Sequence, residues 1–332
     1  MILAGDIGGT KCNLAAFEED GAKLRLVFQR RYATLEFPDF AEVIDQFRRD
    51  VTNAKSFAGG DFMAAGFGVP GVVVAGEQHT INMPWPFDHL QIAAKLNLSP
   101  AHIAVVNDLV ATAWAILKLP PSEFLVLNKG ATQLDGNKAV IAAGTGLGEA
   151  ILFWDGQQHR VSPSEGSVAD FAPRNDREIE LFRYMKKSIP HVYCEEILSG
   201  RGFRWIHESL NPSARHATFN QPPAESAHEI TRFALEKSCP VCVETLNLWT
   251  EMYGAEAGNI AVRVLAYGGV YIAGGIALKI LPKMKDGSFV RAFCDKAKLS
   301  SVLARIPISI VLNEDAPLWG AAYQALSLAR GA

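Results

Sequence analysis

The sequence predicts an α/β protein made of two duplicated domains with a central cleft between them. Two stretches, "GDIGGTKCNLAAF" and "AAGTGLGEAILF", share the order strand, glycine-rich turn, strand, and lie about 140 residues apart, too far for a short tandem repeat. The chain has 332 residues, which is long for a single hydrophobic core. Two similar halves that face each other would leave a cleft, where small ligands usually bind.

In the first part of the chain, predicted strands and helices alternate. Residues 2–17 are expected to form a strand, a turn and a strand, and residues 38–51 place apolar side chains at helical spacing. Residues 62–77 are strand-like, with glycine and proline interruptions. The stretch "HIAVVND" predicts a buried strand that ends at Asp108, where a helix begins at once.

The later part of the chain repeats these elements. Residues 138–154 predict a second strand, glycine turn and strand, and residues 268–281 predict a strand, a double glycine and a helix. Residues 211–227 are rich in Pro, Ser and Asn and predict a surface loop. The tail 316–330 predicts a helix.

Composition excludes several classes of protein. With 49% hydrophobic and 20% charged residues, the chain is typical of a globular protein. The net charge of −3 and the lack of a Lys/Arg block argue against nucleic-acid binding. Because Asp6 interrupts the N-terminal apolar stretch and no apolar run approaches the roughly 18 residues of a membrane span, we expect a cytoplasmic protein without membrane association.

The five cysteines are an odd number scattered along the chain, which favours reduced thiols over a disulfide framework. Cys239 and Cys242 form "CPVC", which is compatible with redox or zinc chemistry, but no second Cys/His pair with matching spacing follows. The segment His228–Leu248 looks helical, so these cysteines are expected to be buried thiols on one packed face.

The glycine-rich turns are candidate phosphate sites because several exposed backbone N–H groups in one concavity bind phosphate oxygens. "GDIGGTK" is not a Walker A loop, and "GTGLG" lies between strands rather than before a helix. A third glycine loop, "AGG", follows at 273–275. Asp108, at the junction of a strand and a helix, is either an N-cap or a base that the helix N-terminus keeps ionised. Its position alone leaves both roles open.

Seven motifs together carry a resemblance to a known family. In order they are "GDIGGTK", "VVND", "AGTGLG", "EG..ADFAP", "HVYCEEILSG", "GAEAGNIAVRVLAYGGVYIAGGI" and "NEDAPLWGAA". This order resembles that of bacterial glucokinases, ATP-dependent hexose kinases of the actin/hexokinase/Hsp70 superfamily with ribonuclease-H-like domains. The zinc-binding cysteine cluster and the N-terminal helix-turn-helix of the related repressor/kinase family are absent from the sequence, which places the resemblance with the zinc-free branch.

The resemblance implies a role for particular residues. Asp108 would be the general base that takes the proton from the 6-hydroxyl of a hexose, most simply glucose. The sugar would also be bound by Asn82, Asn107, Glu165 and Glu195, with Glu196 as the alternative to Glu195.

The same resemblance implies the sites of ATP and Mg²⁺. ATP would bind the first turn through Gly8, Gly9, Thr10 and Lys11, the second turn through Gly144, Thr145 and Gly146, and the third loop through Gly274 and Gly275. Asp6 would hold Mg²⁺ through water, since magnesium keeps part of its hydration shell. The family resemblance further implies a homodimer, with a small domain 1–107 that the helix 316–330 rejoins and a large domain 108–315.

The stretch "SEGSVADFAP" departs from the family pattern Glu-Gly-Gly-His. Ser167 and Val168 stand where the family has Gly and His, and that His would bind a hydroxyl near the anomeric end of the sugar. Valine neither donates nor accepts a hydrogen bond. The expectation is therefore a glucose kinase with weakened or altered sugar selection; the alternatives are a kinase for another hexose or an amino sugar, and a catalytically weak, sugar-sensing homologue.

Overall fold

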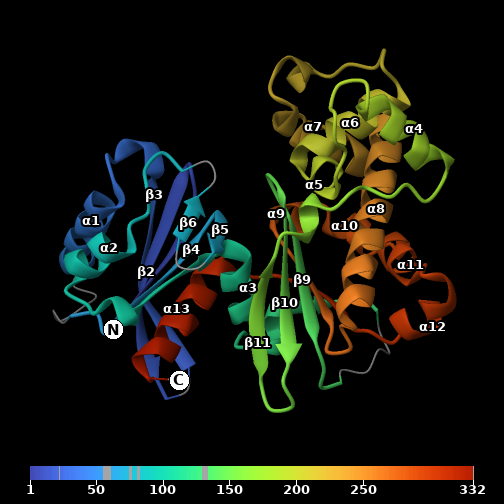
Figure 1. The fold of residues 1–332 in the computed structure, drawn as a ribbon. Helices are drawn as coiled ribbons and strands as arrows, with labels where there is room; N and C mark the ends of the chain where they lie inside the picture. The colour runs from blue at the N-terminus through green and yellow to red at the C-terminus, as the bar shows by residue number, and fades with distance from the viewer. Residues whose placement is uncertain (22, 55–60, 75–76, 81–82, 129–133, 332) are drawn as a thin grey trace. The chain divides into compact units, whose positions relative to one another are not determined.

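The computed structural model describes residues 1–332 except 22, 55–60, 75–76, 81–82, 129–133 and 332. The chain forms two compact units (Figure 1). Unit 1 comprises Met1–Pro121 and Asn313–Ala332, and unit 2 comprises Ser122–Leu312. Each unit has its own sheet, and each is described by itself.

Unit 1 is built on a five-stranded mixed sheet in the order β3-β2-β1-β4-β7. Its strands are β1 (Ile2–Ile7), β2 (Lys11–Asp20), β3 (Lys23–Ala33), β4 (Ala64–Val69) and β7 (Ile103–Asn107). The first three are antiparallel neighbours, whereas β4 is parallel to β1 and β7 is parallel to β4. A small hairpin of β5 (Gly71–Val74) and β6 (Glu77–Thr80) follows β4.

Helices pack on the sheet of unit 1 through two hydrophobic clusters. One cluster joins the sheet to α1 (Phe40–Asn53) and α2 (His89–Leu96). The other joins it to α13 (Ala316–Ala329), which also packs against α3 (Asp108–Ile116). Gly320 allows this close crossing, because a Cβ there would lie 1.6 Å from the carbonyl oxygen of Ala111.

Unit 2 repeats this strand order. Its six-stranded sheet runs β11-β10-β9-β12-β13-β8. The strands are β8 (Phe124–Val126), β9 (Lys138–Ala143), β10 (Leu147–Trp154), β11 (His159–Ser164), β12 (Val270–Ala273) and β13 (Ile308–Val311). As in unit 1, three neighbouring strands, β11, β10 and β9, are antiparallel. On the other side of β9, the strands β12 and β13 continue the sheet parallel to it. The duplication that the two hairpins predict is therefore present in the topology.

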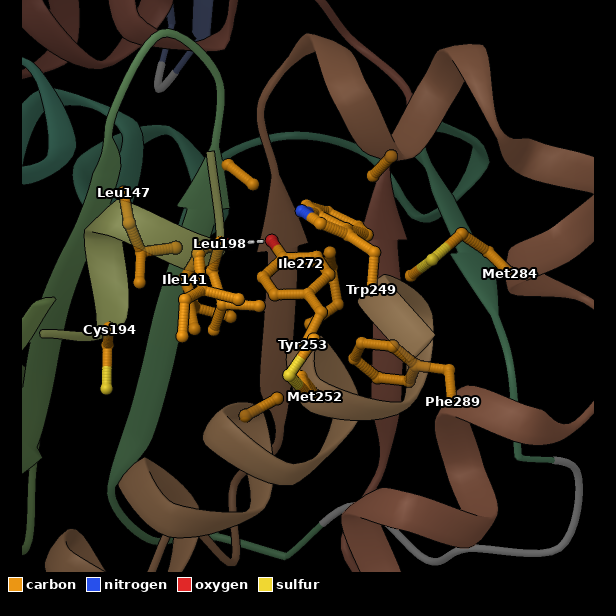
Figure 2. Packing of buried hydrophobic residues seen from close by; sticks show 14 of the residues in the cluster. Ile141, Leu147, Cys194, Leu198, Trp249, Met252, Tyr253, Ile272, Met284 and Phe289 are labelled. Atoms are coloured by element: carbon orange, nitrogen blue, oxygen red, sulfur yellow. Dashed lines mark hydrogen bonds between the residues drawn. The ribbon is translucent and has the colours of Figure 1, made fainter. Parts of the chain in front are cut away.

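Five helices of unit 2 lie between β11 and β12 in sequence. They are α4 (Asp176–Met185), α5 (Cys194–Ile197), α6 (Gly200–Leu210), α7 (Ser226–Leu235) and α8 (Pro240–Val264). After β12 come α9 (Gly275–Lys279), α10 (Leu281–Met284), α11 (Ser288–Cys294) and α12 (Ser300–Leu303). The long helix α8 carries Tyr253, whose ring packs against Trp249 of the same helix and against Phe289 of α11 in the core (Figure 2).

One predicted helix is wrong in extent. The segment His228–Leu248 is not continuous, because α7 ends at Leu235 and α8 begins only at Pro240. Lys237 has a positive φ of 56°, which ends a right-handed helix, and Pro240 is the first residue of the next one. Cys239 is therefore the half-buried N-cap of α8, while Cys242 is fully buried in its first turn.

The structure divides the chain at other residues than those expected from the sequence. The compact units separate after Pro121 and before Asn313, whereas the sequence suggested boundaries at 107/108 and 315/316. The difference follows from α3, which packs on α13 and β4 of unit 1. In the described part of the chain, none of the helices combines the length and the apolar composition needed to cross a bilayer.

Candidate active site

In unit 1, three parallel strands end at one edge of the sheet and bring acidic and amide side chains together. In the strand register, Asp6 of β1 lies beside Gly68 of β4, and Val69 lies beside Asn107 of β7. Gly68 lies against the first turn of α3, since a Cβ there would lie 3.2 Å from the Cβ of Ala111 and 3.5 Å from the Cα of Asp108. The carboxyl edge of parallel strands is where ligands of such sheets bind. Asp6, Asn107 and Asp108 therefore share one site-forming edge.

Asn107, not Asp108, is the N-cap of α3. Its side-chain oxygen accepts a hydrogen bond from the N–H of Leu109 at 2.8 Å, and its side-chain nitrogen donates to the carbonyl of Gly71 at 2.9 Å. Asp108 is the first residue of the helix, and its Oδ1 also accepts from the N–H of Leu109 at 2.8 Å. Since Asn107 fills the N-cap position, the cap alternative for Asp108 is wrong.

The first glycine turn joins β1 to β2. The N–H of Gly8 donates to the carbonyl of Lys11 at 2.8 Å, which closes the turn. Thr34, the residue that follows β3, fixes the turn, because its hydroxyl donates to the carbonyl of Gly8 at 2.7 Å and its N–H donates to the carbonyl of Thr10 at 3.1 Å. Gly9 is half-buried, and Thr10 and Lys11 are exposed. The turn thus presents its tip to solvent on a fixed base.

Asp315 is a member of this cluster that the sequence reasoning missed. Its carboxylate accepts hydrogen bonds from Asn13 and Gln29, each at 3.0 Å, and forms an ion pair with Arg31 at 2.9 Å. Its only sequence signal was its place in the "NEDAP" motif, about 200 residues beyond Asp108 in the chain and brought near it by the fold.

The charges of this edge interact. Burial, then the carboxylates of Asp108 and Asp315, raise the pKa of Asp6 to about 7, while Arg31 opposes the shift. Three carboxylates within electrostatic range, balanced by one arginine, leave excess negative charge beside the first glycine turn. Oxygen donors with such a charge are the ligands that Mg²⁺ prefers.

In unit 2, the second and third glycine loops lie at one edge of the sheet. The turn 144–146 follows β9 and the glycines 274–275 follow β12, and these two strands are parallel, with Ala142 opposite Ala273. Gly274 has a φ of 86°, and a Cβ there would lie 2.5 Å from the carbonyl oxygen of Ala143. Thr145, Gly274 and Gly275 are exposed. The two loops predicted to bind ATP are therefore adjacent.

Glu195 connects this turn to α6. One carboxylate oxygen accepts from the N–H of Leu147 at 3.0 Å, and the other accepts from the guanidinium of Arg201 at 2.7 Å. Gly146 leaves the space for it, since a Cβ there would lie 2.5 Å from Glu195 Oε2. Glu196 also faces Arg201, at 3.4 Å. Arg201, two residues after the "LS" of the family motif, is a second residue that the sequence reasoning missed.

The turn that contains Glu165 packs against a buried acid, Glu149. Glu165 precedes the 3₁₀ turn Gly166–Val168, and a Cβ on Gly166 would lie 2.2 Å from an oxygen of Glu149. Glu165 is exposed, and partial desolvation and the carboxylate of Glu195 raise its pKa, so the two predicted sugar ligands of this unit are electrostatic neighbours. Ser167 is buried, whereas Val168 is 49% exposed. Of the two residues that depart from the family pattern, only Val168 thus lies on the surface of the turn.

Asn82, the remaining predicted sugar ligand, lies outside the described residues. The predicted site residues that the structure describes form two groups. Unit 1 holds Asp6, Gly8, Gly9, Thr10, Lys11, Asn107 and Asp108, and unit 2 holds Gly144, Thr145, Gly146, Glu165, Glu195, Gly274 and Gly275.

Comparison with known proteins shows the family of the chain. The family model described as glucokinase matches residues 3–328. A glucokinase of Nostoc sp. (strain PCC 7120) is 35% identical, and the match covers 99% of each chain. Among solved structures, a glucokinase from an Antarctic psychrotroph matches with a TM-score of 0.83 and 27% identity over 98% of each chain. A glucokinase from Balamuthia mandrillaris in complex with glucose has a TM-score of 0.77 at 20% identity, covering 99% of this chain and 93% of that one.

The family match and the full-length relative thus lead to the same conclusion as the ordered motifs and the two repeated sheets. The chain belongs to the glucokinase family, whose members are ATP-dependent phosphotransferases that act on glucose.

Proposed function

We propose that this chain transfers the γ-phosphoryl group of ATP in line to the 6-hydroxyl of glucose, with Asp108 as the general base. The observation that carries this proposal is the position of Asp108, at the start of α3 beside two further carboxylates on the carboxyl edge of the sheet. The helix N-terminus favours the ionised carboxylate. An ionised carboxylate accepts the proton that the sugar hydroxyl loses as its oxygen attacks phosphorus.

Glucose is proposed to bind through Asn82, Asn107, Glu165 and Glu195. Asn107 can do so without leaving α3, because its amide has a second N–H and its oxygen a second lone pair beyond the two bonds already made. Glu195 holds the N–H of Leu147 and the guanidinium of Arg201, which orient its carboxylate. A carboxylate held in this way suits a ligand that offers hydroxyl donors in set directions.

ATP is proposed to bind the glycine loops. The parallel strands β9 and β12 place the turn 144–146 beside Gly274 and Gly275. This arrangement suits a phosphate contact at the turn 144–146 and an adenosine contact at Gly274 and Gly275. Gly8, Gly9, Thr10 and Lys11 are assigned to the phosphates from unit 1. Backbone N–H groups in such turns neutralise phosphate charge without a side chain that must be ordered.

Asp6 is proposed to hold Mg²⁺ through water, and the donor set fits. Its pKa is raised by burial, by Asp108 and by Asp315, so a divalent cation would relieve a concentration of negative charge at this edge. When bound, the ion supplies charge neutralisation for the phosphates. The expectations of a homodimer and of a cytoplasmic location rest on the resemblance and on the sequence.

The proposal is tested by measuring ADP release from Mg·ATP by the purified protein with a panel of hexoses and amino sugars. ADP release with glucose supports the proposed reaction. Release with another sugar alone would favour the alternative of changed selection through Val168. ATP binding without release for any sugar would favour a sugar sensor.

A Val168→His variant is expected to have a lower KM for glucose. Burying a sugar hydroxyl against valine costs roughly 1–3 kcal/mol, which corresponds to about 5- to 150-fold in affinity. Val126→His is the matched control, because Val126 is 51% exposed and Val168 49%, and Val126 lies on β8, outside the proposed sites. An unchanged or higher KM for Val168→His would contradict the proposal that position 168 contacts a hydroxyl of glucose.

A further inference from the structure

Four metal-ligating side chains converge in unit 2 outside the proposed active site. They are His207 on α6, His216 in the following loop, Cys239 at the N-cap of α8 and Cys242 in its first turn. One nitrogen or sulfur atom from each lies within 4.8 Å of all the others. His207 and Cys242 are fully buried.

Hydrogen bonding does not account for this convergence. Nε2 of His216 lies 3.2 Å from Nε2 of His207, 3.2 Å from Sγ of Cys242 and 3.8 Å from Sγ of Cys239. An imidazole nitrogen carries either one proton or one lone pair, so it cannot bond well to three partners. Around a tetrahedral Zn²⁺ with these ligands, the ligand atoms are about 3.3–3.8 Å apart, as follows from bonds of roughly 2.0 Å to nitrogen and 2.3 Å to sulfur. The observed spacings are close to that arrangement.

The protonation chemistry of the ligands also suits a cation. His207 is fully buried beside a second imidazole, where a neutral ring that keeps a lone pair costs less than a charged one. Both sulfurs lie at the positive N-terminal end of the 25-residue helix α8, which favours thiolates. A bound Zn²⁺ would stabilise both sulfurs as thiolates, so both thiols would release their protons when the ion binds.

Apolar rings pack around the two histidines of the cluster. The ring of Phe219 packs edge-on against both imidazoles, with centroids 5.0 Å from His207 and 5.4 Å from His216, and the ring of Phe233 lies 5.0 Å from His216. Four protein ligands in an apolar shell leave no open position for substrate, which is typical of a structural zinc site rather than a catalytic one.

We propose that His207, His216, Cys239 and Cys242 bind one structural Zn²⁺ ion. The ion fastens the loop between α6 and α7 to the beginning of α8. That loop, residues 211–225, contributes one buried hydrophobic side chain, Phe219, to the core. A metal bond therefore replaces the apolar contacts that the segment lacks.

The proposal is tested by measuring zinc in the full-length protein by mass spectrometry, after expression with zinc and purification under reducing conditions. We expect one zinc per chain, and none in His207→Ala or Cys242→Ser. The controls are His228→Ala and Cys294→Ser, which remove the same side-chain types outside the cluster and should keep the metal. Chelation of the wild type is expected to lower Tm by roughly 5–10 °C, the change for loss of a ligand bound well above its Kd.

A second measurement, on the wild-type protein, tests the proposal even if the variants fail to fold. Cobalt titrated into the chelated wild-type protein should give the visible absorption of a tetrahedral thiolate site at one equivalent, and zinc should displace it. Absence of zinc, together with absence of this absorption in protein with free thiols, would overturn the proposal. So would retention of zinc by both ligand variants, or a disulfide between Cys239 and Cys242 in the reduced preparation.

Discussion

An Asp108→Asn variant is expected to lower kcat for glucose phosphorylation by about 10²- to 10⁴-fold, the contribution of a positioned general base. Asparagine keeps the size of the side chain and can still accept from the N–H of Leu109, as Asp108 Oδ1 does at 2.8 Å. It cannot accept the proton of the sugar hydroxyl. The KM for glucose should change little, because binding through the other proposed ligands is retained.

The matched control is Asp176→Asn. Asp176 is also the first residue of a helix whose N-cap is an asparagine, Asn175, so the substitution removes the same helix-terminal charge. That charge contributes roughly 0.3–1 kcal/mol to a helix, and its loss at α4 should leave kcat unchanged. Equal losses of kcat in the two variants, or full activity of Asp108→Asn in a steady-state ADP-release assay, would exclude Asp108 as the base.

The free energy of unfolding is expected to fall by about 3 kcal/mol between pH 4.5 and pH 7 because of one buried acid, Glu149. Its pKa is raised from 4.5 to about 7, first by burial and then by the carboxylate of Glu256, which Arg263 partly offsets. Glu149 Oε1 is buried without a hydrogen-bond partner among the described residues. In this pH range the folded chain holds a proton that the unfolded chain releases, so stability declines as pH rises.

A Glu149→Gln variant removes this proton linkage and keeps the shape that Gly166 accommodates. The unfolding free energy of the variant minus that of the wild type, measured by denaturant unfolding, should rise by about 3 kcal/mol from pH 4.5 to pH 7. Taking the difference between the two proteins cancels titrations that they share. Glu180→Gln, at an exposed position of α4, should show no such trend. A pH-independent difference for Glu149→Gln would show that this carboxyl is not shifted.

The fold was largely predictable because local patterns agree with the tertiary structure. Both glycine hairpins, the helix after Asp108 and the C-terminal helix all lie where alternation, helical spacing and glycine placed them. The helix over His228–Leu248 failed at Lys237, whose left-handed backbone leaves no mark in apolar spacing. Pro240 was the available signal, since proline at this position begins a helix rather than continuing one.

The candidate site was predictable only where residues belong to a motif. Asp315 reaches its place because α13 returns to unit 1, and no spacing rule connects it to Asp6 or Asp108. The histidine–cysteine cluster was missed for a related reason. In zinc motifs of regular spacing a second ligand pair follows the first cysteine pair, whereas here both histidines precede Cys239 and come from another helix and a loop. Contacts between distant elements depend on packing, which one sequence does not display.

The return of α13 to unit 1 has a consequence for how the chain matures during synthesis. Unit 2 is one continuous segment, 122–312, whereas unit 1 needs both ends of the chain. Until α13 has left the ribosome, the face of β1 that carries Ile2 and Ala4 lacks its cover of Leu318 and Ala321. Domains commonly fold as units in order of synthesis. Here the part made first is the part completed last, and its apolar face stays uncovered during that interval.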